Sequence, residues 1–544
     1  MPFNERIKNY LSWLLVAVVS FVVFLESSIP YWYAEKRTPA GYQFLGQVAY
    51  TPDQNMYFSF TSQARDGSFI MNNKLTYLPN RPVFVNLEFW VVGFVQRLTG
   101  VSENAIYQLW RYWGALLLTI GVVMLVRIVL PEGKRRLAAI FLLLFSGGFG
   151  FVFALLSGAH LIGFDATQAG IIDMRYGLLP FQQMITNPHF SFPHGLILIA
   201  YAYYLKGERT NILQYYLTSG LFFIIIGLVR PYDLIPPVII FPLWAIVVQR
   251  GAAFERQLFW RRCSPLFMIA PVFLYNVWLF RFNDIFKYWA QQGLNAGSLP
   301  SPLWHYLAYG IIGVLAIVRL LQVRTNPLGR QGQFLVIWFG VTFVFIHLGK
   351  LIPALGWSPQ IGVYLAVPLA LLACSLRYPE RVISRSKYYV LAAVVALCVV
   401  ASNISIVLYF AKNFRDINKM GIYYARNEEV EAWQWLKENA KKGSVVLAGE
   451  TASQRVAKYT HSSVVAAHYS VTPRFAETET MVNSVLSNPD LIGQLPLLKT
   501  LHVDYLYMSP GEGNQGNIKV NGGANIAVVF SNSLITIYRI NRGL

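Results

Sequence analysis

Long apolar runs separated by short polar segments dominate the hydrophobic pattern of this chain. A helix that crosses a bilayer needs about 20 mostly apolar residues. By this measure about eleven segments are expected to span a membrane. They cover roughly residues 10–29, 105–130, 137–158, 190–206, 212–229, 234–250, 264–282, 302–322, 332–348, 359–376 and 388–411. The pattern therefore predicts an α-helical polytopic membrane protein.

Basic residues collect in every second loop between these runs, as expected for loops that stay in the cytoplasm. The pattern holds if the N-terminus, with Arg6 and Lys8, lies inside. The short apolar segment 83–98 carries polar groups and would break this alternation if it spanned. We interpret it as a juxtamembrane or re-entrant helix on the outer side, where protein can bury its polar groups. The first outer loop then covers about residues 30–104.

After residue 411 the composition changes to that of a soluble domain. Residues 428–440 have the pattern of an amphipathic helix, and 444–448, 503–508 and 535–540 have that of strands. Eleven spans place this domain, 412–544, outside the cytoplasm and leave residues 1–411 as the transmembrane domain. We expect a small α/β domain there, in a protein of the bacterial cytoplasmic (inner) membrane.

The composition agrees with this class, since 55% of the residues are hydrophobic and only 13% are charged. The net charge of +19 does not indicate nucleic-acid binding, because the basic residues sit in short loops between apolar runs. The three cysteines lie in or beside those runs and predict neither a disulfide framework nor a thiolate metal site.

One acidic residue of the first outer loop has two possible roles. Asp53 follows Pro52 at the start of a predicted helix, in which Met56, Phe60 and Ala64 form an apolar stripe. Its carboxylate can cap that helix by accepting N–H bonds. Alternatively, it can act as a general base that takes the proton of an acceptor hydroxyl at the membrane surface.

Four features together resemble a known superfamily. They are the acidic residue after Pro52 in a long first outer loop, the amphipathic segment 83–98, short proline-bearing spans with Arg230-Pro-Tyr-Asp233 at an outer end, and a terminal block from Ala432 to Tyr507. The chain is similar to the GT-C superfamily of polytopic glycosyltransferases, and most similar to its dolichyl-phosphate-mannose-type or RgtA/B/C/D-like members.

The resemblance implies an inverting transfer of a sugar from a polyprenyl-phosphate donor to a glycan, lipid or protein acceptor, with Asp53 as the base. Many members carry a second acidic residue directly after the first, and this chain has Gln54 instead. A single carboxylate is a poor ligand set for a divalent cation. We therefore expect no metal or other cofactor. The expected partners are the donor, an unknown hydroxyl acceptor and membrane lipids.

A lipid phosphate needs cationic or N–H donors near the outer leaflet. The candidates for this contact are Arg81, Arg175, His189, Arg230 and Lys350. Arg230 can equally be an interfacial arginine paired with Asp233. Similar proteins often place an arginine near the outer start of the penultimate helix, where this chain has Gln360. Glu88, Asp233 and Gln360 are further candidates for the lining of the cavity that binds the donor. An acidic group at membrane depth, such as Glu88 in the re-entrant helix, is costly unless it has a partner.

Two other classes of function stay open. A transporter or flippase of a lipid-linked glycan predicts repeats or charges near mid-membrane. If the protein is instead a noncatalytic membrane assembly protein, the helices serve only as an anchor. The histidines of the terminal domain, His461, His468 and His502, indicate no catalytic arrangement by their spacing.

Overall fold

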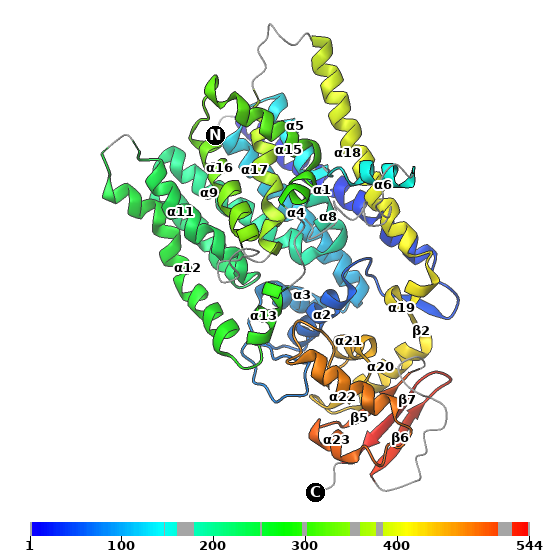
Figure 1. Ribbon diagram of the computed structural model, residues 1–544. Helices are drawn as coiled ribbons and strands as arrows, with labels where there is room; N and C mark the ends of the chain where they lie inside the picture. The colour runs from blue at the N-terminus through cyan, green and yellow to red at the C-terminus, as the bar shows by residue number, and fades with distance from the viewer. Residues whose placement is uncertain are drawn as a thin grey trace. The chain divides into compact units, whose positions relative to one another are not determined.

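The computed structural model describes residues 3–145, 147–159, 179–250, 253–295, 302–348, 359–376, 385–509 and 525–541 (Figure 1). The chain divides into two compact units. We call the first the helical unit; it comprises Met1–Tyr33, Tyr107–Leu274 and Ala296–Asn413. We call the second the α/β unit; it comprises Ala34–Ile106, Tyr275–Asn295 and Phe414–Leu544. Most of residues 30–104, the predicted first outer loop, thus belong to the same compact unit as the C-terminal segment.

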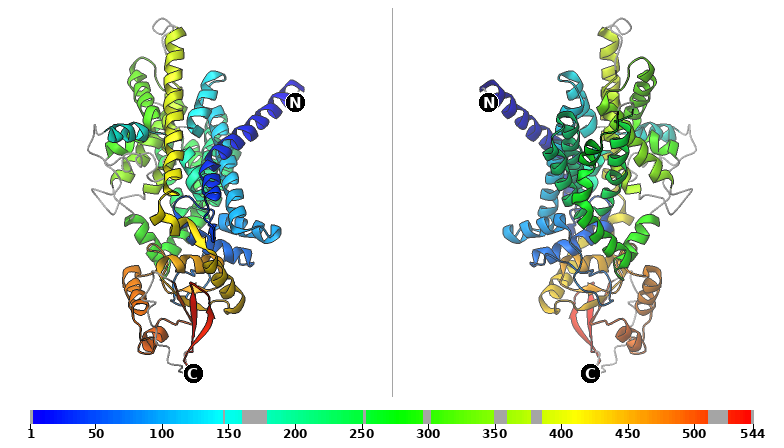
Figure 2. Two further views of the ribbon diagram at one scale, coloured as in Figure 1. Left: turned by 90° about the vertical axis from the view of Figure 1, so that its right-hand side faces the viewer. Right: turned by 90° about the vertical axis from the view of Figure 1, so that its left-hand side faces the viewer.

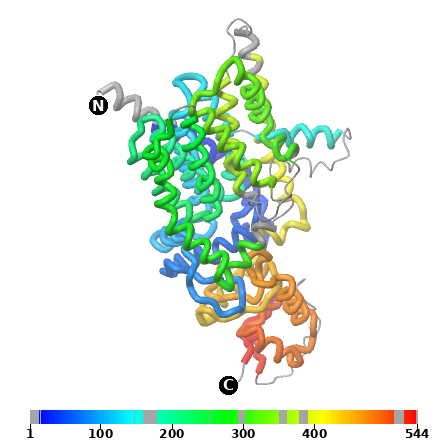
Figure 3. Tube along the Cα trace, turned by 60° about the vertical axis from the view of Figure 1, so that its left-hand side comes forward, coloured from blue at the N-terminus to red at the C-terminus, as the bar shows by residue number. Residues whose placement is uncertain are grey.

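The helical unit is built from α-helices and short 3-10 helices. These are α1 (Phe3–Lys36), α4 (Glu103–Val129), α5 (Lys134–Phe145), α6 (Gly150–Gly158), α8 (Pro180–Thr186), α9 (Pro188–Thr210), α10 (Leu213–Gly227), η2 (Pro231–Leu234), α11 (Ile235–Val247), α12 (Arg256–Phe282), α14 (Pro302–Leu307), α15 (Gly310–Leu321), η3 (Gln322–Arg324), α16 (Arg330–Leu348), η5 (Pro359–Tyr364), α17 (Ala366–Cys374) and α18 (Arg385–Asn413). Neighbouring helices α9 and α10 pack side by side, as the green tubes in Figure 3 show.

Five helices of the described residues are long and apolar enough to cross a membrane, within Val16–Lys36, Glu103–Val129, Arg256–Phe282, Arg330–Leu348 and Ala392–Asn413. A sixth span results if α5 and α6, which meet at a bend of 53°, count as one. Three further apolar helices are shorter; α10, for example, has 15 residues and reaches about 22 Å at 1.5 Å per residue. The described residues therefore contain several helices that can span a membrane, while the count of eleven and the orientation stay predictions.

A buried arginine joins three helices of the helical unit. Arg111 on α4 donates to Met184 O at 3.2 Å, to Ser27 O at 2.8 Å and to Ser27 Oγ at 2.9 Å. Its guanidinium also lies 3.9 Å from the ring centroid of Tyr31. A buried charge is tolerated when it is fully hydrogen-bonded, so Arg111 ties α1, α4 and the end of α8 together.

The α/β unit contains the following elements: β1 (Tyr42–Phe44), α2 (Thr51–Arg65), α3 (Leu87–Thr99), α13 (Lys287–Asn295), η6 (Ile417–Lys419), α19 (Met420–Tyr423), β2 (Tyr424–Arg426), α20 (Asn427–Asn439), β3 (Val445–Leu447), α21 (Glu450–Tyr459), β4 (Ser463–Val464), α22 (Phe475–Ser487), α23 (Leu495–Thr500), β5 (Tyr505–Met508), β6 (Ile526–Ser531) and β7 (Thr536–Ile540). The predicted terminal helix and three predicted strands are confirmed as α20, β3, β5 and β7.

A five-stranded mixed sheet forms the centre of the C-terminal segment; its strands β6 and β7 are the red arrows in Figure 2. Its strand order is β4-β3-β5-β7-β6. Strand β3 is parallel to β4 and β5, whereas β7 is antiparallel to β5 and β6. Helix α22 buries Val482, Val485 and Leu486 against Leu447 and Leu506 of the sheet. This apolar core gives the α/β unit its stability.

Helices α2 and α3 of the first outer loop pack closely. The predicted stripe of Met56, Phe60 and Ala64 is buried. A Cβ atom on Gly93 of α3 would lie only 2.4 Å from Thr61 O of α2. Because any side chain there would clash with backbone, the absence of one at Gly93 permits this approach. The segment 83–98 is thus helical over Leu87–Thr99.

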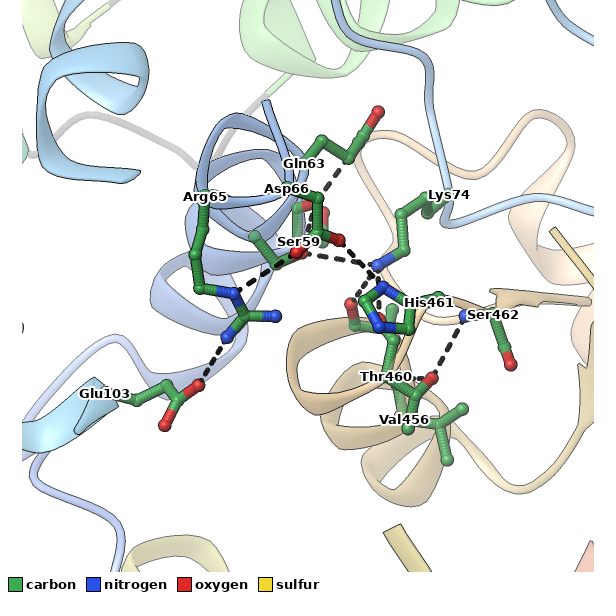
Figure 4. Close-up of polar contacts among 12 residues, drawn as sticks. Ser59, Gln63, Arg65, Asp66, Lys74, Glu103, Val456, Thr460, His461 and Ser462 are labelled. Carbon is green, nitrogen blue, oxygen red and sulfur yellow. Dashed lines mark hydrogen bonds and ion pairs between the residues drawn. The ribbon is translucent and has the colours of Figure 1, made fainter. Parts of the chain in front are cut away.

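The segment between α2 and α3 is held by the C-terminal segment, as Figure 4 shows. Lys74 Nζ donates to Ala457 O at 2.8 Å and Thr460 O at 2.7 Å. At the end of α2, Asp66 Oδ2 lies 2.7 Å from His461 Nδ1. A second attachment is the antiparallel pairing of β1 with β2. First loop and C-terminal segment therefore share one hydrogen-bond network.

Two buried lysines make the stability of this unit depend on pH. Burial lowers the pKa of Lys74 to about 7 and that of Lys458 to about 7, while an unfolded lysine titrates near pH ~10.4. Between these values the unfolded chain binds more protons, so stability rises as the pH increases from 7 to about 10. We expect the thermal unfolding midpoint in detergent to rise over this interval, and to rise less steeply in Lys458→Met.

The matched control is Lys437→Met, which removes an exposed lysine of α20 and is expected to keep the wild-type pH dependence. A Lys458→Met profile that runs parallel to the wild type would contradict the prediction.

Candidate functional site

Asp53 lies in the first turn of α2 and is partly exposed. The helix begins at Thr51 after Tyr50, which is the N-cap residue in a left-handed conformation. Asp53 is thus not the N-cap residue. Its Oδ1 atom lies 3.2 Å from His468 Nε2, a residue 415 positions away in the chain. The Asp53 side chain is 33% exposed, whereas that of His468 is 0% exposed.

Further contacts, to Nδ1 and to the face of the ring, hold the imidazole of His468. The backbone N–H of Ser470 donates to His468 Nδ1 at 3.2 Å, and Ser470 Oγ lies 2.8 Å from the same nitrogen. The ring of Tyr469 stacks against it with centroids 4.7 Å apart. Asp53 therefore faces a fixed, buried imidazole on one side and solvent on the other.

Further acidic groups surround this pair. Burial raises the pKa of Glu450, and the charge of Glu479 raises it further. Burial also raises the pKa of Tyr469, and the charge of Asp53 adds to the shift. Across the part of the chain that the structure describes, no three His, Cys, Asp or Glu side chains gather to hold a metal ion. The arrangement presents an oriented carboxylate that can accept a proton.

Arg230 and Asp233 form a buried charge pair in the helical unit. Arg230 Nε lies 3.2 Å from Asp233 Oδ2, and the two side chains are 1% and 0% exposed. The guanidinium lies 4.7–5.6 Å from the ring centroids of Phe190, Tyr232 and Tyr364. Arg230 is thus a buried arginine in an aromatic cage, and does not extend to the surface as an interfacial arginine would.

Two histidines lie on α9 of the helical unit. His189 is buried in its first turn, where the Asn187 side chain accepts its backbone N–H at 3.0 Å, and it lies within electrostatic range of Asp233. His194 Nδ1 lies 2.7 Å from Gln183 Oε1. His189, Arg230 and Asp233 therefore belong to one electrostatic cluster.

The other predicted site residues are placed as follows. Arg81 is exposed in the segment before α3, and Glu88 is buried in the first turn of α3. Gln360 lies in η5. Arg175 and Lys350 fall outside the described residues. Asp53, Arg81 and Glu88 belong to the α/β unit, whereas Arg230, Asp233 and His189 belong to the helical unit.

The α/β unit also holds a polar pocket of about 510 Å³, lined among others by Glu103, Trp433, Glu438 and His461. Glu103 accepts from Arg65 Nη1 at 2.7 Å, which puts the pocket beside the last turn of α2. Twelve residues of helix separate Asp53 from Arg65, a rise of about 18 Å at 1.5 Å per residue. The pocket is therefore separate from the carboxylate.

The sequence reasoning missed His468. Its partner lies in the first outer loop, and no periodicity or motif connects residues so far apart. The one sequence signal is the polar cluster that surrounds it, His468-Tyr-Ser470 followed by Thr472, which is too common to indicate a site.

Comparison with known proteins gives a likeness of fold. ArnT from Cupriavidus metallidurans bound to undecaprenyl phosphate matches with a TM-score of 0.52 and 14% identity, over 97% of this chain and 98% of that chain. The apo state of the same protein gives 0.50 and 12%, over 98% and 99%. The apo oligosaccharyltransferase of Archaeoglobus fulgidus gives 0.50 and 11%, over 91% and 69%.

No family model matches the sequence, and no curated protein matches it. The chain therefore has a fold like that of ArnT and of the oligosaccharyltransferase, which agrees with the predicted resemblance at the level of the fold. Which member it is closest to in activity is a separate matter, because a fold does not fix a function.

The Arg230–Asp233 pair yields a test of the helical unit. Replacing Asp233 by Asn leaves a buried guanidinium without its countercharge, which typically costs about 3–5 kcal/mol. We expect Asp233→Asn to lower the thermal unfolding midpoint in detergent clearly. The double variant Arg230→Met with Asp233→Leu, which removes both charges, is expected to recover most of the loss. If the double variant is no more stable than Asp233→Asn, the unpaired charge is not the cause of the lost stability.

Proposed function

We propose that this protein is a membrane glycosyltransferase that transfers a sugar from a polyprenyl-phosphate donor to a hydroxyl acceptor outside the cytoplasm. The proposal is supported by the fold likeness along nearly the whole chain to ArnT, a protein solved with undecaprenyl phosphate bound. In this proposal the N-terminus lies inside, about eleven helices span the membrane, and the C-terminal α/β segment lies outside.

The observation that carries the proposal is the state of Asp53. A general base must be ionisable, oriented and within reach of substrate. Asp53 is partly exposed, and its other side contacts a buried imidazole.

The chemistry is a single displacement. Asp53 takes the proton of the acceptor hydroxyl while the acceptor oxygen forms a bond to the anomeric carbon. The bond from that carbon to the phosphate oxygen breaks, and its electron pair stays on the phosphate. Attack from the opposite side inverts the anomeric centre. Because the polyprenyl phosphate is already anionic when it leaves, no general acid is needed.

The leaving phosphate needs cationic stabilisation. Arg230 is the first candidate for it, since guanidinium binds phosphate through two parallel N–H bonds. The buried position of Arg230 beside Asp233 means that a bound phosphate competes with that carboxylate. His189, Lys350, Arg175 and Arg81 are further candidates for the same contact, and Glu88 and Gln360 for the wall of the cavity.

The proposal is tested by the release of free polyprenyl phosphate. Purified protein in lipid is given a panel of polyprenyl-phosphate sugars together with a crude pool of membrane glycans as acceptor. We expect one donor to be turned over by the wild type, and Asp53→Asn to be slower by about a hundredfold to ten-thousandfold, the usual contribution of a general base.

The matched control is Asp66→Asn. Asp66 directly follows α2 and also contacts a histidine of the C-terminal segment, but no role in proton transfer is proposed for it. Its turnover is expected to stay close to that of the wild type. Full turnover by Asp53→Asn would exclude Asp53 as the base, and the absence of release with every donor would count against transfer and favour transport.

A further inference from the structure

We propose that His468 is a positioning residue for Asp53, so that the C-terminal segment completes the catalytic centre. This inference rests on the proposed role of Asp53 as the base. It concerns a contact that joins the first outer loop to a residue after β4, with Asp53 Oδ1 and His468 Nε2 separated by 3.2 Å.

The hydrogen bonds fix which ring nitrogen of His468 carries the proton. A backbone N–H can only donate, and that of Ser470 points at His468 Nδ1 from 3.2 Å. Nδ1 must therefore accept, which leaves the proton of the neutral ring on Nε2. The Nε2–H group then donates to Asp53 Oδ1. The Asp53 carboxylate is thus held by a directed bond.

The backbone N–H of Ser470 opposes a proton relay through the ring. A relay would require Nδ1 to carry a proton while Nε2 accepts the one that Asp53 has taken. A proton on Nδ1 would face the N–H of Ser470, and two donors repel each other. His468 can therefore orient Asp53, while the proton taken from substrate stays on the carboxylate or passes to solvent at its exposed side.

Hydrogen bonds hold the turn that carries His468 in place. Thr472 Oγ1 accepts from the backbone N–H groups of Ala467 and His468 at 3.2 and 3.3 Å. The same hydroxyl donates to Leu75 O at 2.6 Å, and Asn73 Nδ2 donates to Val471 O at 2.8 Å. A further bridge pairs Thr76 with Ala466. The turn is thus attached to the loop that follows α2.

These hydrogen bonds explain how the partly exposed carboxylate of Asp53 can keep one orientation. Asp53 can otherwise rotate about its side-chain bonds, since no side chain caps the start of α2. With Oδ1 engaged by His468, the remaining lone pairs of the 33% exposed carboxylate point away from the buried ring. A base held in this way loses little freedom when it meets the acceptor hydroxyl.

The first part of the test is kinetic and uses the full-length protein in lipid with the donor found by polyprenyl-phosphate release. His468→Ala removes the donor group, whereas His468→Gln supplies an amide N–H at a similar reach. We expect His468→Ala to lower kcat by about tenfold to a hundredfold with little change in KM for the donor. His468→Gln is expected to recover most of the lost kcat. Thermal unfolding midpoints are measured for each variant.

The matched control is the pair His461→Ala and His461→Gln. His461 contacts Asp66 in the same way and at the same interface of first loop and C-terminal segment, but Asp66 is not a proposed base. Both control variants are expected to keep kcat close to that of the wild type. Losses of kcat that are equal in His468→Ala and His468→Gln, or a wild-type kcat in His468→Ala, would overturn the positioning role.

The second part of the test does not depend on turnover. In protein labelled with ¹⁵N at histidine, His468 is assigned by the signal missing in His468→Gln. We expect Nε2 to be the protonated nitrogen and its proton to shift upfield in Asp53→Ala, where the acceptor is lost. An Nδ1–H form, or no response to Asp53→Ala, would overturn the inference even if the glycosyltransferase assay succeeds. If that assay fails while the bond is observed, the base assignment fails and the contact stands.

Discussion

The segment between α2 and α3 has little regular secondary structure, so its backbone and polar groups must find partners elsewhere. The C-terminal segment supplies them. Lys74 donates to the last turn of α21, and Asn73, Leu75 and Thr76 contact the turn after β4. This exchange fixes the turn, the turn fixes His468, and His468 contacts Asp53. The geometry of the proposed site therefore depends on the hydrogen bonds that satisfy the polar groups of this one irregular segment.

The helical unit also has buried polar groups that need partners, and some of these groups are charged. Its interior holds several buried arginines, among them Arg111 and Arg230. Arg111 is satisfied by neutral oxygens of Ser27 and Met184, and its role is to join helices. Arg230 instead has a carboxylate partner, Asp233, and three aromatic rings. A paired guanidinium in an aromatic cage can exchange its partner for another anion, which is why we favour Arg230 over Arg111 for a phosphate.

The likeness to ArnT and to the oligosaccharyltransferase concerns the path of the chain, while chemistry depends on individual side chains. This chain has Gln54 after its loop aspartate, and the structure describes a histidine from the C-terminal segment against that aspartate. Both are properties of this sequence, and the fold comparison did not supply them. If this protein prefers a particular donor or acceptor, that preference would therefore depend on such individual side chains and not on the shared fold.

The sequence by itself determined the class of the protein and many of its elements, because hydrophobic periodicity is a local property. It located α2, the helix within 83–98, the apolar stripe of α2, and the terminal α20, β3, β5 and β7. Strand β4, only two residues long, and strand β6, whose side chains are largely exposed, lacked a pattern to predict them. It also singled out Asp53, but left its role as a helix cap open.

Only the tertiary structure decided what these residues contact. The pairing of β1 with β2, the place of Lys74 against α21 and the contact of His468 with Asp53 join residues hundreds of positions apart. The burial of Arg230 likewise depends on rings from α9, η2 and η5. Such contacts follow from the packing of whole elements, and no local preference of the chain specifies them.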